Sequence, residues 1–236
     1  MLVCTGFRSD QRISTHAKDT YGILSHVVDP QTGGLHFYWK NAQNKPYGSL
    51  GALRDQLLAE NLRLTFAMNG GMYQRDQSPL GLFVEAGKLQ APLNTTRHAH
   101  GNFYLQPNGV FYLTAEGTAA ICRTDSFELH SSITYATHSG PMLVRDGALH
   151  PKFRKGSSNL HIRNGVGVLP DGRLLFAQSK QRINFFDFAS FFQQRGCRNA
   201  LYLDGFVSRT YLPAQQWEQL DGRFGVIIGE VAADPH

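Results

Sequence analysis

Turn signals between short apolar runs constrain this chain of 236 residues more than any other feature. The segments QPNG (106–109), RDG (145–147) and PDG (170–172) each lie between apolar runs. Asparagine or aspartate directly before glycine is a strong hairpin signal in such a context. The runs around these turns are NFYL, VFYL, MLV, VGVL and RLLFAQ. The pattern predicts a β-rich middle of the chain, built mostly from antiparallel strands.

More strands are expected on both sides of this middle part. ILSHVV (23–28) and LHFYW (35–39) alternate apolar and polar residues and are separated by DPQTGG, which predicts a hairpin or a pair of neighbouring strands. LRLTFAMNGG (62–71) predicts a strand that ends in a glycine-rich turn, and ALYLDG (200–205) and VIIG (226–229) predict two late strands.

Two segments have the spacing of amphipathic helices. In the segment 49–61 the leucines recur at helical intervals and Ser49 is a plausible N-cap; the leucines are Leu50, Leu53, Leu57 and Leu58. In the segment 184–195 phenylalanines recur in the same way, Asn184 with Asp187 resembles a capping box, and Gly196 ends the helix; the phenylalanines are Phe185, Phe188, Phe191 and Phe192.

Many strands, two clear helices and no repeating βαβ alternation predict an α+β fold. We expect a single domain over residues 21–236, with a mixed or antiparallel β-sheet core and two or more packed helices. Residues 1–20 are polar without a period and predict a loosely ordered N-terminal arm. The length suits one large domain.

Composition narrows the classes of partner. The chain is 42% hydrophobic but has no run of about 18 apolar residues, so no transmembrane segment is expected. The formal net charge of +5 is dispersed, without a basic run interleaved with aromatics, so nucleic acid is not expected as a partner. A mild positive balance favours anionic substrates. The apolar stretch at the N-terminus is too short for a signal peptide, which leaves the compartment open.

The sequence predicts neither a metal site nor a cofactor. Cys4, Cys122 and Cys197 are isolated, without CxxC spacing, so packing or one bridge between Cys4 and Cys197 is the simple explanation for them. His98 and His100 could pair on a metal, but two loop histidines are the simpler interpretation. A P-loop is also absent from the sequence.

Four segments share one signature, in which an apolar strand meets glycine and a polar or charged residue: FAMNGGMY (66–73), THSGPMLVRDG (137–147), IRNGVGVLPDGRLLF (162–176) and ALYLDGFVS (200–208). Glycine at such a place lets backbone N–H groups approach a ligand. A carboxylate at the end of a rigid strand is well placed for catalysis, which makes Asp204 the first catalytic candidate. The candidate binding residues are Asn69, Gly70, Gly71, Ser139, Gly140, Arg163, Asn164, Gly205 and Ser208.

Structural explanations compete with these roles. Asp204 and Gly205 together are ordinary turn chemistry. Arg163 could be a surface salt-bridge partner, and Asn69 could be a left-handed turn residue. Ser139 has no GxSxG around it, so a serine nucleophile is not favoured.

The order and spacing of these segments resemble the phosphodiester glycosidase family, to which the domain of the lysosomal uncovering enzyme belongs. Its motifs correspond here to NGGMY, SGPMLVRDG, RNGVGVLPDGR and LDGFVS, over about residues 21–229. Two departures stand out. The family's Asp-Gly-Gly-Gly-Ser has Phe206 and Val207 in place of two glycines, and its Arg-Thr-Ala is here Arg163, Asn164 and Gly165. Both departures bear on the substrate rather than on the fold.

The resemblance implies a hydrolase that cleaves a sugar-1-phosphodiester, with a small-molecule or glycan phosphodiester as partner and an extracytoplasmic location. Asp204 is then the catalytic carboxylate, and Glu85 is a weaker candidate for the second carboxylate that glycosidases usually use. Arg163 would anchor the phosphate through its fork of donors. Because each adjoins an apolar strand next to glycine, Asn69, Ser139, Arg163 and Asp204 are expected to line one cleft.

Two other functions stay open. One is a non-catalytic module on the same fold that binds carbohydrate or cell envelope. The other is a hydrolase of a different phosphodiester, such as a nucleotide derivative. Fold analogy cannot separate these functions, and the sequence does not predict the oligomeric state.

Overall fold

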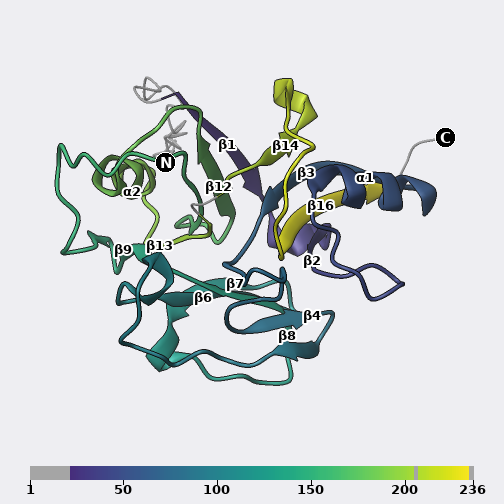
Figure 1. The fold of residues 1–236 in the computed structure, drawn as a ribbon, viewed down its shortest axis with the longest axis horizontal. Helices are drawn as coiled ribbons and strands as arrows, with labels where there is room; N and C mark the ends of the chain where they lie inside the picture. The colour runs from purple at the N-terminus through teal and green to yellow at the C-terminus, as the bar shows by residue number, and fades with distance from the viewer. Residues whose placement is uncertain (1–21, 205–206, 234–236) are drawn as a thin grey trace, which may run out of the picture.

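The computed structural model describes residues 22–204 and 207–233, so the predicted arm over 1–20, Cys4 and Gly205 lie outside the described residues. Within the described residues, the chain forms two α-helices and three sheets in which every strand pair is antiparallel (Figure 1). This arrangement agrees with the predicted α+β class. Neither described helix is long and apolar enough to cross a membrane.

The strands of the three sheets interleave along the chain. In spatial order, the first sheet contains β1 (Ile23–Val28), β12 (Leu174–Ser179), β11 (Asn164–Val168), β13 (Asn199–Tyr202), β9 (Met142–Arg145) and β10 (Ala148–Leu149). The second sheet contains β15 (Trp217–Glu218), β14 (Thr210–Leu212), β3 (Leu62–Asn69), β16 (Ile227–Ala233) and β2 (Leu35–Tyr38). The third sheet contains β5 (Lys88–Ala91), β4 (Phe83–Glu85), β8 (Ile133–Ser139), β6 (Gly109–Thr114) and β7 (Ala119–Arg123).

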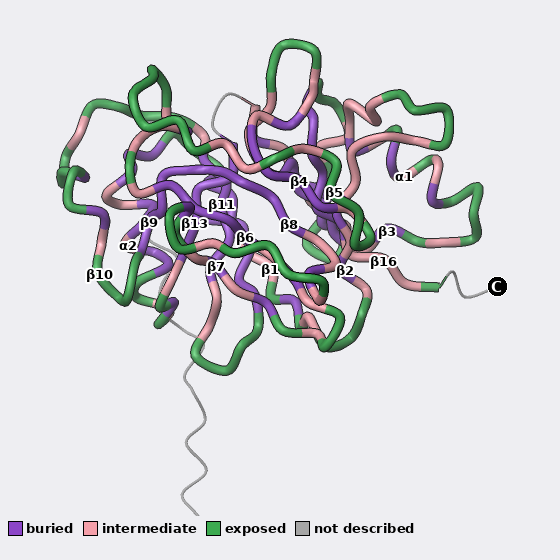
Figure 2. Tube along the Cα trace, turned by 90° about the horizontal axis from the view of Figure 1, so that it is seen from below, coloured by how far each residue is buried: buried purple, intermediate pink, exposed green. Residues whose placement is uncertain are grey.

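All three sheets share one hydrophobic core. Phe66 of the second sheet packs against Phe176 of the first, with ring centroids 5.1 Å apart, and Phe37 packs against Phe111 of the third at 5.3 Å. Each buried phenylalanine stabilises the fold by about 1.5–3 kcal/mol through removal of apolar surface from water. Figure 2 shows the buried residues in the interior strands and the exposed ones in the peripheral loops. The sheets are therefore held as one body around this core.

The helix α1 (Leu50–Ala59) covers the second sheet and confirms the predicted helix over 49–61. The Ser49 side chain accepts a hydrogen bond from the Ala52 N–H at 3.1 Å, which caps the first turn as predicted. Leu57 is buried, but Leu58 is 56% exposed. Each step along a helix turns the side chain by about 100°, so a residue adjacent to the buried stripe can face solvent.

The helix α2 (Phe185–Gln194) packs on β9 and β10 of the first sheet, and its Phe185 ring contacts Tyr202 of β13. Its cap is the predicted one, because Asn184 Oδ1 accepts from the Asp187 N–H at 2.9 Å and Asn184 Nδ2 donates to the Asp187 carboxylate at 2.8 Å. Gly196 follows the helix with φ of 79°, a left-handed conformation that favours glycine. Local signals thus define both ends of this helix.

Two of the three predicted turns form hairpins. RDG (145–147) joins β9 to β10, and PDG (170–172) joins β11 to β12. The prediction of a hairpin at QPNG (106–109) is wrong, because the residues before this turn form a short 3-10 helix instead of a strand. Asn108 Nδ2 donates to the Phe103 carbonyl at 3.0 Å and closes this loop on itself. The 3-10 helices are η1 (Pro30–Thr32), η2 (Asn102–Tyr104), η3 (Thr124–Ser126) and η4 (Pro213–Gln215).

The predicted pairing of the first two strands is also wrong. β1 pairs with β12 in the first sheet, whereas β2 pairs with β16 in the second. The connecting turn η1 is capped by Asp29, which accepts from the Gln31 N–H at 3.0 Å. Alternation along a strand sets which side chains face the core, but it does not select the partner strand.

Candidate active site

Four strand ends from all three sheets meet beside Asp204. Asn69 ends β3, Ser139 ends β8, Asn164 begins β11, and Asp204 follows β13. All four residues are buried. The glycine-marked segments that were singled out in the sequence therefore do converge in space.

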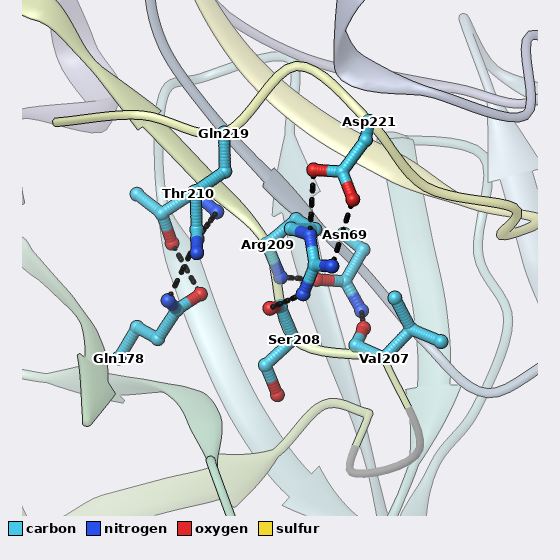
Figure 3. Close-up of polar contacts among 8 residues, drawn as sticks. All are labelled: Asn69, Gln178, Val207, Ser208, Arg209, Thr210, Gln219 and Asp221. Atoms are coloured by element: carbon cyan, nitrogen blue, oxygen red, sulfur yellow. Dashed lines mark hydrogen bonds and ion pairs between the residues drawn. The ribbon is translucent and has the colours of Figure 1, made fainter. Parts of the chain in front are cut away.

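Asn69 is the centre of this convergence. Its Nδ2 donates to Asp204 Oδ2 at 3.2 Å and to the Val207 carbonyl at 2.6 Å, and its Oδ1 accepts from the Arg209 N–H at 2.8 Å. Figure 3 shows Asn69 between Val207 and Arg209. The single side chain of Asn69 therefore fixes both the Asp204 carboxylate and the segment that follows it.

Three further polar side chains hold the backbone around Asp204. Asn164 Nδ2 donates to the Asn69 carbonyl at 2.9 Å, while Asn164 Oδ1 accepts from the Asp204 N–H at 2.9 Å. Ser139 Oγ donates to the Leu203 carbonyl, and Ser208 Oγ donates to the Asp204 carbonyl at 3.0 Å. Asn69, Ser139, Asn164 and Ser208 form what we call the Asp204 cradle. The cradle positions the carboxylate before any ligand binds.

A cavity of about 680 Å³ lies next to the cradle and is lined by Asp204; we call it the Asp204 cavity. Among the described residues that line it, Asp204 is the only carboxylate. Its volume falls within the range of about 300–1,000 Å³ that is usual for small-ligand sites. The other ionisable side chains of the wall are Tyr73, Arg75, His100, Tyr104 and Arg223.

Tyr73 shares the electrostatic environment of Asp204. Burial, with a contribution from the negative charge of Asp204, raises the pKa of Tyr73 to about 12, while Arg223 acts in the opposite direction. The Tyr73 phenol therefore keeps its proton at neutral pH and can donate a hydrogen bond in the cavity. Because the charges of Asp204 and Arg223 both influence the pKa of Tyr73, both side chains lie within electrostatic reach of it.

The expected position of Arg163 in the cleft is a prediction that needs correction. Its guanidinium is buried and donates to the Ile183 carbonyl through Nε at 2.8 Å, to the Asn159 carbonyl at 2.9 Å and to Tyr202 Oη at 3.3 Å. It also stacks on the Phe185 ring at 3.6 Å. Successive residues of a strand point to opposite faces, so Asn164 faces the cradle and Arg163 faces α2. Of the four residues expected to line one cleft, only Asp204 lines the Asp204 cavity; Asn69 and Ser139 lie in the cradle beside it, and Arg163 lies on the other face of the strand.

The glycines next to the cradle make room for protein rather than for a ligand. A Cβ on Gly70 would lie 2.8 Å from Val226 Cγ1, and a Cβ on Gly71 would lie 2.7 Å from the His138 carbonyl oxygen. A Cβ on Gly140 would lie 2.5 Å from the Asn108 Cβ. Gly70 thus packs against the segment at the start of β16, Gly71 against β8 and Gly140 against the loop before β6, so all three glycines act in packing. Gly205 lies outside the described residues.

Glu85 does not line the Asp204 cavity, so it is not placed to act together with Asp204. It ends β4, half-buried beside Trp39, and burial raises the pKa of its carboxyl. The two carboxylates that the sequence suggested as a catalytic pair, Asp204 and Glu85, therefore do not share this cavity. Its place at the β4–β5 hairpin agrees with the alternative that it is a hairpin residue.

Sequence reasoning missed Tyr73, Arg75 and Arg223 as site residues. Tyr73 and Arg75 follow the NGG motif within six residues of Asn69, so proximity to the motif was an available signal. Arg223 lies on a loop before β16 and carries no local signal. His100, for which the sequence favours a loop position over a metal pair with His98, also lines the cavity.

The cysteines and histidines of the described residues form no reactive cluster. Cys197 is a free, buried thiol, and burial raises its pKa to about 12, while Cys4, the other residue of the suggested bridge, lies outside the described residues. Burial also raises the pKa of Cys122 to about 11. Within the described ranges, no three His, Cys, Asp or Glu side chains are grouped closely enough to hold a metal ion.

The sequence model of the phosphodiester glycosidase family (NAGPA) matches residues 63–224, a range that contains the whole Asp204 cradle. The chain belongs to this family. Uncharacterized protein YigE of Escherichia coli (strain K12) is 36% identical over 194 residues, which are 82% of this chain and 75% of that protein. The family assignment predicted from the four motifs is confirmed.

Solved structures share the fold of this family member. The catalytic domain of zebrafish N-acetylglucosamine-1-phosphodiester α-N-acetylglucosaminidase, auto-inhibited by its pro-peptide, matches with a TM-score of 0.59 at 14% identity, over 90% of this chain and 84% of that one. A Burkholderia pseudomallei protein matches with a TM-score of 0.63 at 10% identity, over 88% of this chain and 73% of that one. At such low identity, these likenesses show the fold alone.

Proposed function

We propose that this protein hydrolyses the glycosidic bond of a sugar-1-phosphodiester in the Asp204 cavity. The observation that carries the proposal is the position of Asp204, whose carboxylate is held by Asn69 Nδ2 at 3.2 Å and lines a cavity of small-ligand size. Membership of the phosphodiester glycosidase family supports the reaction type.

The chemistry of the leaving group explains how a single carboxylate can be sufficient for catalysis. When the bond between the anomeric carbon and the phosphate oxygen breaks, the electron pair stays on that oxygen and a phosphomonoester leaves. A phosphomonoester has a second pKa of about 6, so it leaves without a strong general acid. The second carboxylate that most glycosidases use for this protonation is then less necessary.

Asp204 would act on the sugar side of the same bond. Positive charge develops on the ring as the bond breaks, and a fixed carboxylate stabilises it without having to reorient. A water molecule then adds its oxygen to the anomeric carbon and releases a proton to Asp204 or to solvent. The cradle supports this role because it holds the carboxylate through buried hydrogen bonds.

The test is hydrolysis of a panel of sugar-1-phosphodiesters in water enriched in oxygen-18. Free sugar that carries the heavy oxygen is the expected product, because water attacks carbon. Heavy oxygen in the phosphate would mean cleavage of a P–O bond, and the protein would then be a phosphodiesterase instead of a glycosidase. Saturable binding of the panel without any product would identify a binding module and contradict the proposed hydrolysis.

A further inference from the structure

Two arginines at the Asp204 cavity form no ion pair within the described part of the chain. Arg75 and Arg223 both line the cavity and are exposed. Within the described part of the chain, neither guanidinium makes a hydrogen bond or an ion pair. By contrast, Arg209 nearby is paired with Asp221. The cavity mouth thus carries two positive charges that an anionic ligand can neutralise.

The backbone of Arg223 is fixed on both sides. Asp221 binds the Arg209 guanidinium through two hydrogen bonds of 2.8 Å (Figure 3). On the other side, the Phe224 N–H donates to the Gly48 carbonyl at 2.9 Å, and the Phe224 carbonyl accepts from Gln77 Nε2 at 2.9 Å. Arg223 therefore projects from a braced segment, which lowers the entropy cost of holding a ligand.

Arg75 lies at the tip of a closed turn on the same cavity. The turn is closed by the Gln74 N–H, which donates to the Ser78 carbonyl at 2.8 Å. The neighbouring carboxylate forms no ion pair with Arg75, and Asp76 Oδ1 instead accepts from the Ser78 N–H at 3.0 Å and from Ser78 Oγ at 2.6 Å. These bonds hold Asp76 within the turn, and the guanidinium of Arg75 remains available to a ligand.

The rest of the wall of the Asp204 cavity is suited to bind a sugar ring rather than a second charged group of the ligand. Met72, Leu80, Phe103 and Tyr104 give it apolar and aromatic surface. Aromatic rings pack against the apolar faces of ligands, and Tyr104 also offers a hydroxyl. The cavity therefore combines an apolar wall, the Asp204 carboxylate and two unpaired cations.

We propose that Arg75 and Arg223 are the phosphate-binding residues of the Asp204 cavity, in the role that the sequence suggested for Arg163. The inference rests on the proposed function for the nature of the anion, which is the phosphate of a sugar-1-phosphodiester. Guanidinium groups match phosphate oxygens through their planar fork of donors. As the glycosidic bond breaks, the phosphate gains charge, so the arginines bind the departing group more tightly than the intact diester.

The test is a calorimetric titration with inorganic phosphate, at constant ionic strength maintained with chloride. Wild-type protein is expected to bind phosphate saturably. Arg223→Gln should weaken this binding by about 10-fold or more, as for loss of a charge-assisted hydrogen bond, and Arg75→Gln by a smaller factor. Arg223→Lys should fall between wild type and Arg223→Gln, because it keeps the charge and loses the fork.

Arg145→Gln is the matched control, since Arg145 is an exposed arginine on β9 that lies outside the cavity. It should leave phosphate binding unchanged. Equal weakening by Arg145→Gln would mean diffuse surface charge and would overturn the proposal, as would wild-type affinity in both cavity variants. The titration involves no sugar and no turnover. Binding as expected with no hydrolysis of the panel would therefore reject the proposed function and keep this anion site.

Discussion

At the scale of single residues, the site depends on which face of its strand each polar side chain occupies. Asn69, Asn164 and Ser139 all converge on Asp204, as the glycine-marked strand ends predict. Arg163 is the neighbour of Asn164 in the same motif, yet its side chain points to the opposite face. The direction depends on the register of β11 between β12 and β13, with Asn164 opposite Gln178 and Gly165 opposite Tyr202, and a shift by one residue would exchange the two faces.

Arg163→Lys should therefore lower stability rather than substrate binding. Lysine keeps a buried charge but cannot replace the hydrogen bonds to Ile183, Asn159 and Tyr202 or the stacking on Phe185. We expect a loss of about 2–4 kcal/mol in the free energy of unfolding, as for a broken buried network. Urea denaturation measures this loss. A raised KM for a sugar-1-phosphodiester at unchanged stability would instead support the phosphate role for Arg163.

At the scale of elements, local signals predict the helices well because caps and apolar spacing are encoded within a few residues. Ser49 and Asn184 cap their helices as predicted. The positions of loops are less predictable from local sequence, since the loop of Arg223 is held by contacts with segments that are distant in sequence. The Arg209–Asp221 pair joins the segment after Asp204 to the loop that carries Arg223 (Figure 3).

Asp221→Asn should raise KM while leaving the fold nearly unchanged. The pair is exposed at the Asp221 side, and such pairs are worth about 0–1 kcal/mol of stability. Without the carboxylate, the Arg223 loop loses one of its two braces, so phosphate binding should weaken several-fold. Steady-state kinetics and thermal unfolding on the same sample measure both effects. The matched control is Asp171→Asn, which breaks a similar exposed pair with Arg173; if both variants show the same KM, the bracing role is wrong.

At the scale of the whole molecule, the α+β class is predictable from the sequence, but the pairing of strands is not. β1 and β2 are consecutive and yet belong to different sheets, because each pairs with a strand more than 140 residues later. The site exists only where the three sheets meet. One residue before Ser139, the buried His138 lies at this junction, with Nε2 2.8 Å from Thr124 Oγ1.

His138 predicts how the stability of the whole fold depends on pH. Burial lowers its pKa from 6.5 to about 4, so the folded protein keeps it neutral while the unfolded chain takes up a proton as pH falls below 6.5. Stability is therefore lost between pH 6.5 and 4, by roughly 3 kcal/mol from this group. His138→Gln should flatten this part of the dependence, measured by urea unfolding at pH 7 and pH 4.5. The exposed His98→Gln variant should keep the wild-type dependence, and an unchanged pH dependence in His138→Gln would contradict the assignment.

The measurement that tests the central claim most directly is turnover of a hydrolysed sugar-1-phosphodiester by Asp204→Asn, with Tm determined on the same preparation. Asparagine is nearly isosteric, and its amide oxygen can still accept from Asn69 Nδ2, so the Tm should stay close to that of wild type. Loss of the charge that acts on the developing cation should lower kcat by a factor on the order of 10² or more. If Asp204 were only part of a structural aspartate-glycine turn, the variant should keep the wild-type kcat as well as the Tm, because asparagine before glycine is an equally good turn. Wild-type kcat in Asp204→Asn would contradict the catalytic role of Asp204.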